Sequence, residues 1–231
     1  RNFLYQSGFF RQKRLPCSVV CVGNLTTGGT GKTPWVQLIS RYYSNIEKNV
    51  TIVSRGYTGD FSGTLKVDAK MDPRRCGDEP LWLKKNTQAN VYVGKSRFEA
   101  GARVLKETNT DLIILDDGYQ HRKLFRDFDL VLLDASAPER HYHMLPTGRL
   151  REPFSQLKRA HAVIINKCNY AKAEQVQFLE DKTQQYLPTE HIFKANFVFD
   201  RWYPVINSIW QKLKEPEVAL SCGVGNPKAF F

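Results

Sequence analysis

A glycine-rich run between an apolar segment and a helix-like segment constrains the fold of this chain more than any other feature. The run Thr26-Thr27-Gly28-Gly29-Thr30-Gly31-Lys32-Thr33 follows Ser18–Val22, which has the composition of a buried strand, and precedes Pro34, which suits a first helical turn. Such a turn points successive backbone N–H groups inward, and the following helix adds its partial positive charge. The sequence therefore predicts a nucleotide-binding loop made by residues 26–33.

The residues at the end of this run carry the predicted chemistry. Lys32 is expected to reach the β- and γ-phosphates of the nucleotide, and the Thr33 hydroxyl to ligate Mg²⁺. The usual phosphate-loop pattern has glycine where this chain has Thr26, so the strict motif fails at one position. The alternative is a glycine-rich turn with a stray lysine, but the strand before it and the helix after it favour nucleotide binding.

Composition limits the classes of binding partner and of fold that this chain can have. The formal net charge of +11 indicates an anionic partner, such as a nucleotide, a nucleic acid, an acidic membrane or a phosphorylated substrate, unless the surface is merely basic. The five cysteines contain no C-x-x-C pair, which argues against a disulfide framework or a zinc ribbon. No apolar run approaches the roughly 18 to 20 residues that span a bilayer. The chain lacks an initial Met and stops at Phe231 within a continuing pattern, so we expect it to be truncated at both ends.

Short apolar runs alternate with helix-length amphipathic stretches along the chain. The expected strands are Ser18–Val22, Val50–Ser54, Asn90–Val93, Asp111–Leu115, Asp129–Leu133, Ala162–Asn166 and His191–Ala195. The expected helices are Thr33–Tyr43, Glu79–Lys85, Ser96–Glu107 and Ala171–Tyr186. Strands that are apolar on both faces and separated by helices predict a three-layer α/β/α fold around a mainly parallel sheet, with ligands at the carboxyl ends of the strands.

Two carboxylates follow one of these strands. Asp116 and Asp117 come directly after an apolar run, the usual place for residues that hold Mg²⁺ or its waters beside a phosphate loop. One acidic residue there would indicate only a solvated turn, whereas two followed by Gly-Tyr-Gln-His favour a site. His121, which ends this motif, has both a structural and a catalytic interpretation.

Four more residues are candidates. Asp78 opens an expected helix, where it either complements the helix dipole or accepts the proton of an attacking hydroxyl. Arg55 follows the second expected strand, where it would face an anion. Arg149 and Arg151 lie in a loop between prolines and either bind phosphate or pair with surface acids.

Two other segments leave alternatives open. Asn166-Lys167 begins an N-K-x-D motif of the kind that reads guanine, but Asn169 stands in place of the aspartate, which favours adenine. The aromatic residues 2–10 and the basic residues 11–14 form either an amphipathic segment on a membrane or a segment packed on the core.

Five segments, in this order, resemble the tetraacyldisaccharide 4′-kinase family of lipid A biosynthesis. They are Val22–Pro34, Ser54–Tyr57, Gly77–Pro80, Asp116–His121 and Leu145–Pro153. In that family a hydroxyl or small residue replaces the first loop glycine, which accounts for Thr26. The resemblance implies an enzyme at the cytoplasmic face of the bacterial inner membrane. It would use ATP and Mg²⁺ to phosphorylate the 4′-hydroxyl of a tetraacylated glucosamine disaccharide 1-phosphate, with no nucleic-acid partner.

The resemblance also implies roles and a domain plan. Asp78 would be the base, with Lys32, Asp117 and His121 also catalytic. Thr33, Asp116 and Asp117 would hold the metal, and the three arginines 55, 149 and 151 would contact substrate. Residues 1–195 would form the kinase core with a membrane- or substrate-facing N-terminal segment, and residues 196–231 the hinge strands and the start of a smaller C-terminal α/β lobe.

Two positions depart from the family pattern. Arg149 stands where proline is expected, and Asn226 stands where many members carry a histidine that would assist Asp78. Two other classes compete with the kinase. A partitioning or targeting ATPase would carry a signature lysine at Thr27, and a nucleic-acid-binding ATPase is supported by net charge alone.

Overall fold

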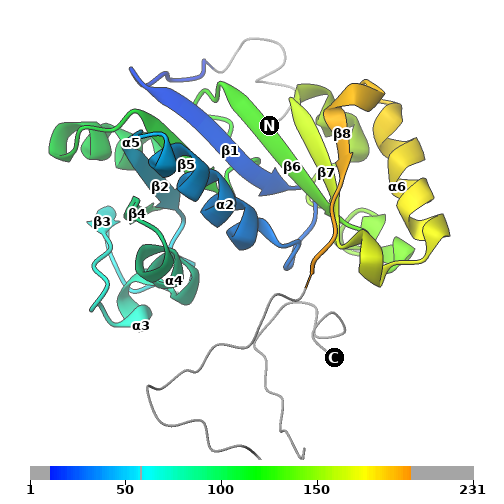
Figure 1. The fold of residues 1–231 in the computed structure, drawn as a ribbon, viewed down its shortest axis with the longest axis horizontal. Helices are drawn as coiled ribbons and strands as arrows, with labels where there is room; N and C mark the ends of the chain where they lie inside the picture. The colour runs from blue at the N-terminus through cyan, green and yellow to red at the C-terminus, as the bar shows by residue number, and fades with distance from the viewer. Residues whose placement is uncertain (1–10, 58, 199–231) are drawn as a thin grey trace, which may run out of the picture.

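The computed structural model describes residues 11–57 and 59–198, which build an α/β/α sandwich around one eight-stranded sheet (Figure 1). The strand order is β3-β4-β2-β5-β1-β6-β7-β8. The strands are β1 Ser18–Asn24, β2 Val50–Ser54, β3 Thr64–Lys66, β4 Asn90–Gly94, β5 Leu112–Asp116, β6 Phe128–Asp134, β7 Ala162–Asn166 and β8 Ile192–Lys194. All neighbours pair in parallel except β3 and β4. The predicted fold class and the seven predicted strands are confirmed, with small shifts at their ends.

Helices cover both faces of the sheet. They are α2 Lys32–Asn45, α3 Pro73–Cys76, α4 Asp78–Asn86, α5 Arg97–Glu107 and α6 Ala173–Gln184. Short 3-10 helices lie at Glu139–Tyr142, Phe154–Arg159, Cys168–Tyr170 and Thr189–His191. Buried residues of α2, α3 and α4 belong to one apolar cluster, whereas those of α5 and α6 belong to another. The two clusters are the two cores of the sandwich, one on each face of the sheet.

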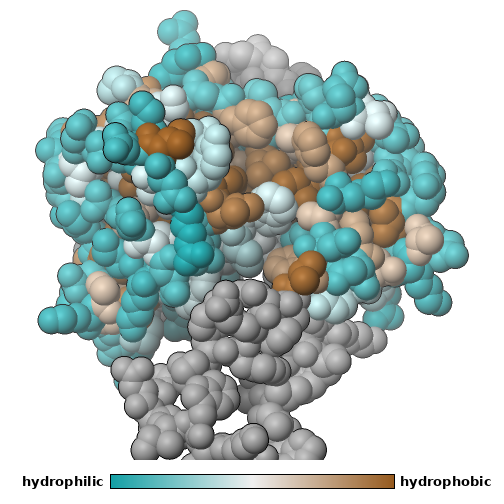
Figure 2. Space-filling model, in the orientation of Figure 1, coloured by the Kyte–Doolittle hydropathy of each residue, from teal (hydrophilic) through white to brown (hydrophobic). Residues whose placement is uncertain are grey.

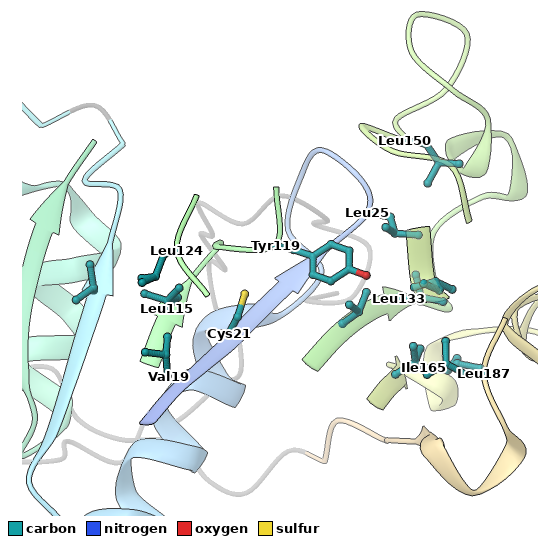
Figure 3. Close-up of a cluster of buried hydrophobic side chains, with 14 of the residues drawn as sticks. Val19, Cys21, Leu25, Leu115, Tyr119, Leu124, Leu133, Leu150, Ile165 and Leu187 are labelled. Atoms are coloured by element: carbon teal, nitrogen blue, oxygen red, sulfur yellow. The ribbon is translucent and has the colours of Figure 1, made fainter. Parts of the chain in front are cut away.

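Side chains alternate along each strand, so each strand contributes residues to both cores. In β5, Ile113 and Leu115 pack in the core beneath α5 and α6, while Leu112 and Ile114 pack in the core beneath α2. Figure 3 shows the first core, where Tyr119 and Leu25 lie beside the carboxyl end of β1. Both faces of the central strands are buried, so their apolar runs are continuous. For this reason the strands could be predicted from the sequence.

Besides the short 3-10 helices, one strand and one α-helix are absent from the sequence prediction. Strand β3 has three residues and pairs antiparallel with β4 at the sheet edge, and α3 is a single turn that starts at Pro73 with Asp72 as its cap. Both are too short to produce a periodic pattern. The hinge strands and the second lobe expected within residues 196–231 lie almost wholly outside the described residues.

The basic residues 11–14 at the described end of the N-terminal segment are exposed, and their backbone pairs with the segment before β6. Lys13 donates its backbone N–H to Lys123 and accepts from Phe125, and the Arg14 guanidinium lies 3.5 Å from the centre of the Phe125 ring. The aromatic residues before it lie outside the described part. No helix of the described residues has both the length and the apolar character to cross a bilayer. Figure 2 shows a largely hydrophilic face with apolar residues gathered towards its middle.

Candidate functional site

The predicted phosphate loop joins the end of β1 to the start of α2. Gly28 and Gly31 have φ angles of 106° and 83°, which residues with a Cβ adopt only under strain. Within the described residues, no side chain caps α2 and its first turn holds no acidic residue. The free N–H groups and the dipole of this helix start therefore favour an anion.

Two residues at the end of β7 donate hydrogen bonds to the backbone of this loop. The Asn166 amide donates to the carbonyl of Thr30 (3.1 Å). The Lys167 ammonium donates to the carbonyl of Gly29 (3.3 Å) and pairs with Asp134 at 2.7 Å. Because a peptide's C=O and N–H point in opposite directions, two carbonyls held outward leave the neighbouring N–H groups facing the cradle.

Asp116 is buried at the end of β5, in register with Val22 of β1. One carboxylate oxygen accepts from the Ser54 hydroxyl at 3.1 Å, and the other has no hydrogen-bond partner within the described chain. Burial, followed by the charge of Glu79, raises the pKa of Asp116 to about 6. A buried carboxylate with an oxygen that accepts from no protein group has the chemistry of a metal ligand.

Asp117 has a positive φ of 50°, uncommon for a residue other than glycine. Lys32 lies 3.5 Å from its carboxylate, and Arg151 binds both carboxylate oxygens, at 2.9 and 3.2 Å. Burial acts to raise the pKa of Asp117, but the Arg151 hydrogen bonds and the Lys32 charge outweigh it and hold the pKa at about 2. Asp117 is therefore ionised at neutral pH and links the phosphate-loop lysine to the arginine loop.

This pair of carboxylates fits Mg²⁺. No group of three or more His, Cys, Asp or Glu side chains in the described ranges has metal-site geometry. Mg²⁺ commonly takes one or two carboxylates and completes its shell with water and substrate phosphates. Asp116, Asp117 and the Thr33 hydroxyl at the start of α2 have the right chemistry for such a shared site.

We expect Asp116→Asn to raise the free energy of unfolding of the metal-free protein by about 1 to 3 kcal/mol at pH 7.5. The pKa of Asp116 is raised from 3.8 to about 6, so the folded state loses stability as pH rises between these values and stays penalised above them. Asparagine removes the buried charge. Urea unfolding at pH 4 and pH 7.5 measures the effect, and an equal gain at both pH values would contradict it.

The segment after β2 lies against the start of α4. Gly77 has a φ of 92°, and a Cβ there would lie 2.8 Å from the carbonyl oxygen of Tyr57, so only glycine permits this approach. Asp78 is the exposed first residue of α4, and the neighbouring charge of Glu79 acts on Asp116. Arg55, also exposed, lies at the same carboxyl edge of the sheet.

The arginine loop runs beside the phosphate loop. Thr27 donates its N–H to the carbonyl of Arg149 at 2.8 Å, and the Arg151 N–H donates to the carbonyl of Leu25 at 2.7 Å. A Cβ at Gly28 would lie 3.3 Å from the Arg149 guanidinium. The structure thus brings both arginines to the nucleotide cradle from a segment more than a hundred residues away.

His121, in the loop after β5, contacts the start of α5. Its Nε2 accepts from the backbone N–H of Arg97 at 3.4 Å, a long contact. Arg97 itself is buried and donates to the carbonyls of Gly94 and Asp116. These contacts support the structural interpretation of His121 more directly than the catalytic one.

Sequence reasoning missed several residues that build the site. Asn24 accepts from Arg151, and its carbonyl accepts from Gln120 at 2.8 Å. Glu152 is buried and pairs with Arg159 at 2.5 Å. Asn24 and Glu152 lie inside the segments Val22–Pro34 and Leu145–Pro153. Their roles were missed because a linear pattern does not show long-range contacts.

The phosphate loop follows β1, and the carboxylate pair lies at the end of β5, which is the neighbour of β1 in the sheet. Together with the mainly parallel sheet, these features define a P-loop nucleotide-binding protein. The family model for Tetraacyldisaccharide-1-P 4'-kinase matches residues 1–231. The chain belongs to this family.

Individual relatives agree with the family match. The chain is 37% identical over 247 aligned residues to the tetraacyldisaccharide 4'-kinase of Syntrophobacter fumaroxidans, covering 100% of this chain and 64% of the relative. It is 40% identical over 183 residues to that of Bdellovibrio bacteriovorus, covering 78% and 54%. The crystal structure of LpxK from Aquifex aeolicus in complex with ATP matches with a TM-score of 0.69 and 34% identity, covering 84% and 58%. The chain thus spans between half and two thirds of these relatives.

Proposed function

We propose that this protein transfers the γ-phosphate of ATP to the 4′-hydroxyl of a tetraacylated glucosamine disaccharide 1-phosphate in lipid A biosynthesis. The observation that carries this proposal is the convergence of five separate family motifs on one edge of the sheet, around a cradle built for phosphate. Membership of the kinase family supports the substrate, and the ATP complex of the Aquifex aeolicus relative supports the nucleotide.

The proposed mechanism needs positioning and charge stabilisation more than covalent chemistry. The N–H groups of residues 26–33 hold the phosphates, and Lys32 neutralises charge that builds on the transferred group. Thr33, Asp116 and Asp117 would hold Mg²⁺, which would supply further positive charge for the transfer. Asp78 accepts the proton of the sugar hydroxyl, since its exposed position at the start of α4 leaves it open to a substrate.

The arginines divide into two proposed roles. Arg151 forms an ion pair with Asp117 at 2.9 Å, so it positions that carboxylate and partly neutralises its negative charge. Arg149 lies beside Gly28, where its guanidinium would contact a phosphate, and the exposed Arg55 would contact the phosphate of the disaccharide. His121 joins the catalytic group only if it moves away from the start of α5.

We also propose that the protein works at the cytoplasmic face of the bacterial inner membrane. Its lipid substrate lies there, and the net charge of +11 favours anionic lipid surfaces. Residues 1–195 would form the kinase core, and residues 196–231 the hinge and the start of a second lobe. Asn226, proposed to replace a base-assisting histidine, lies outside the described residues.

Transfer of labelled phosphate tests the proposed function. The full-length protein is incubated with γ-labelled ATP, Mg²⁺ and an acylated disaccharide 1-phosphate in detergent, and the lipid product is separated and counted. We expect label on the 4′ position of the lipid. ATP hydrolysis without labelled lipid, stimulated by DNA, would instead favour a partitioning or nucleic-acid-binding ATPase.

A further inference from the structure

The loop between β6 and β7 carries an exposed apolar tip. Residues 143–147 are all exposed, and Met144 and Leu145 keep 44% and 51% of their surface in solvent. On either side of this tip the chain is buried, since Tyr142 and Leu150 pack in the core beneath α5 and α6, where Figure 3 shows Leu150. Neighbouring large apolar side chains in solvent are typical of an interaction site.

Backbone hydrogen bonds hold the tip in place. The Leu145 N–H donates to the carbonyl of Leu150 at 3.1 Å, and the Leu150 N–H donates to the carbonyl of His143 at 2.9 Å. The Gly148 N–H donates to the carbonyl of Met144 at 3.1 Å, and a Cβ on Gly148 would collide with the carbonyl oxygen of His143. The fold of the loop therefore imposes the exposure of Met144 and Leu145.

Positive charge surrounds this apolar tip. The exposed Arg140 and Arg149 flank it, and Glu139 is the one acidic residue among residues 139–149. Burial, followed by the charges of Arg149 and Arg140, lowers the pKa of His141, which indicates a positive local field. Such a combination complements an anionic lipid surface, because apolar side chains enter the boundary of the acyl chains while cations meet the headgroup phosphates.

The same loop is fixed to the phosphate loop. Thr26 forms an antiparallel bridge with Leu150, and the Thr27 N–H donates to the carbonyl of Arg149 at 2.8 Å. The tip therefore has a set position relative to the place where phosphate would be transferred. Contact between the tip and a bilayer would bring that place to the membrane surface, where a lipid presents its sugar hydroxyl.

We propose that Met144, Leu145 and Pro146 insert into the surface of an anionic bilayer and that Arg140 contacts its lipid phosphates. This contact orients the transfer site towards the membrane. The occupant of the surface is the bilayer itself rather than the acyl chains of a substrate molecule bound at the site. The inference rests on the proposed function and adds the residues through which the protein meets the membrane.

Sedimentation of the full-length protein with vesicles measures this contact without the substrate. The vesicles are an equimolar mixture of phosphatidylethanolamine and phosphatidylglycerol. Leu145→Glu should lower partitioning onto them about tenfold or more, because it removes an apolar contact and adds a charge that anionic lipid repels. Arg140→Gln should lower it about fivefold and have little effect on neutral phosphatidylcholine vesicles.

Two further variants sharpen the test. Leu38→Glu changes an equally exposed leucine on α2, at 56% exposure, so it is the matched control and should partition as the wild type does. Leu145→Trp should keep vesicle binding, and lipids brominated on their acyl chains should quench its fluorescence beyond that of the wild-type tryptophans.

The outcomes distinguish the surface from the function. Unchanged partitioning of Leu145→Glu, or equal losses in Leu145→Glu and Leu38→Glu, would overturn the membrane surface. Normal vesicle binding by Leu145→Glu with slower phosphate transfer would mean that the tip contacts the substrate instead, which also overturns it. Vesicle binding that depends on Leu145, without transfer of label to the lipid, would uphold the surface and overturn the lipid kinase.

Discussion

Lys32→Ala is expected to lower kcat by about 10³-fold and to leave the fold intact. The ammonium of Lys32 lies at the start of α2 with one observed ion-pair partner in the described chain, Asp117 at 3.5 Å. Removing a group that stabilises charge in the transition state costs about 10² to 10³ in rate, and loss of nucleotide affinity adds to this. Asp117 keeps its two hydrogen bonds from Arg151, so the unfolding free energy should change by less than about 1 kcal/mol.

The measurement is steady-state phosphate transfer, with circular dichroism and thermal unfolding as checks on the fold. Lys48→Ala is the matched control, since Lys48 is an exposed lysine just beyond the other end of α2. A folded Lys32→Ala protein with wild-type turnover would show that residues 26–33 do not bind the transferred phosphate.

The sheet and the phosphate loop could be predicted because their signals are local. Leu112–Leu115 is apolar at every position because both of its faces are buried, and the glycines at 28 and 31 occur where the backbone needs positive φ. The strand, the turn and the helix then follow one another within thirty residues. Local patterns of this kind survive in a single sequence.

The network around the loop could not be predicted because it depends on contacts across the sheet. Lys167 reaches Gly29 from 138 positions away, and Arg151 reaches Asp117 from 34 positions away. The sequence interpretation used Asn166-Lys167 only to weigh guanine against adenine, whereas the structure shows this pair holding the loop. The opposite pKa shifts of Asp116 and Asp117 likewise come from their surroundings, since the two residues are chemically identical: burial raises the pKa of Asp116, whereas Arg151 and Lys32 lower that of Asp117.

Asp78→Asn is expected to lower kcat by about 10² to 10⁴-fold while ATP affinity stays within about twofold. Asp78 is exposed at the first position of α4, so the substitution removes little packing, and its favourable interaction with the helix dipole is about 0.3 to 1 kcal/mol. An amide retains the shape of the side chain but cannot accept the proton of the sugar hydroxyl. The rate should therefore fall in the chemical step rather than in nucleotide binding.

Three measurements distinguish a base from a helix-capping acid. Glu174→Gln, which removes an exposed acidic residue from the first turn of α6, is the matched control and should keep wild-type turnover with a similar change in stability. The single-turnover rate of phosphate transfer at saturating ATP should fall in Asp78→Asn and stay unchanged in the control. Lower ATP affinity with unchanged saturated turnover would instead assign Asp78 to nucleotide binding, because a proton acceptor acts on the transferring step and not on the bound ground state.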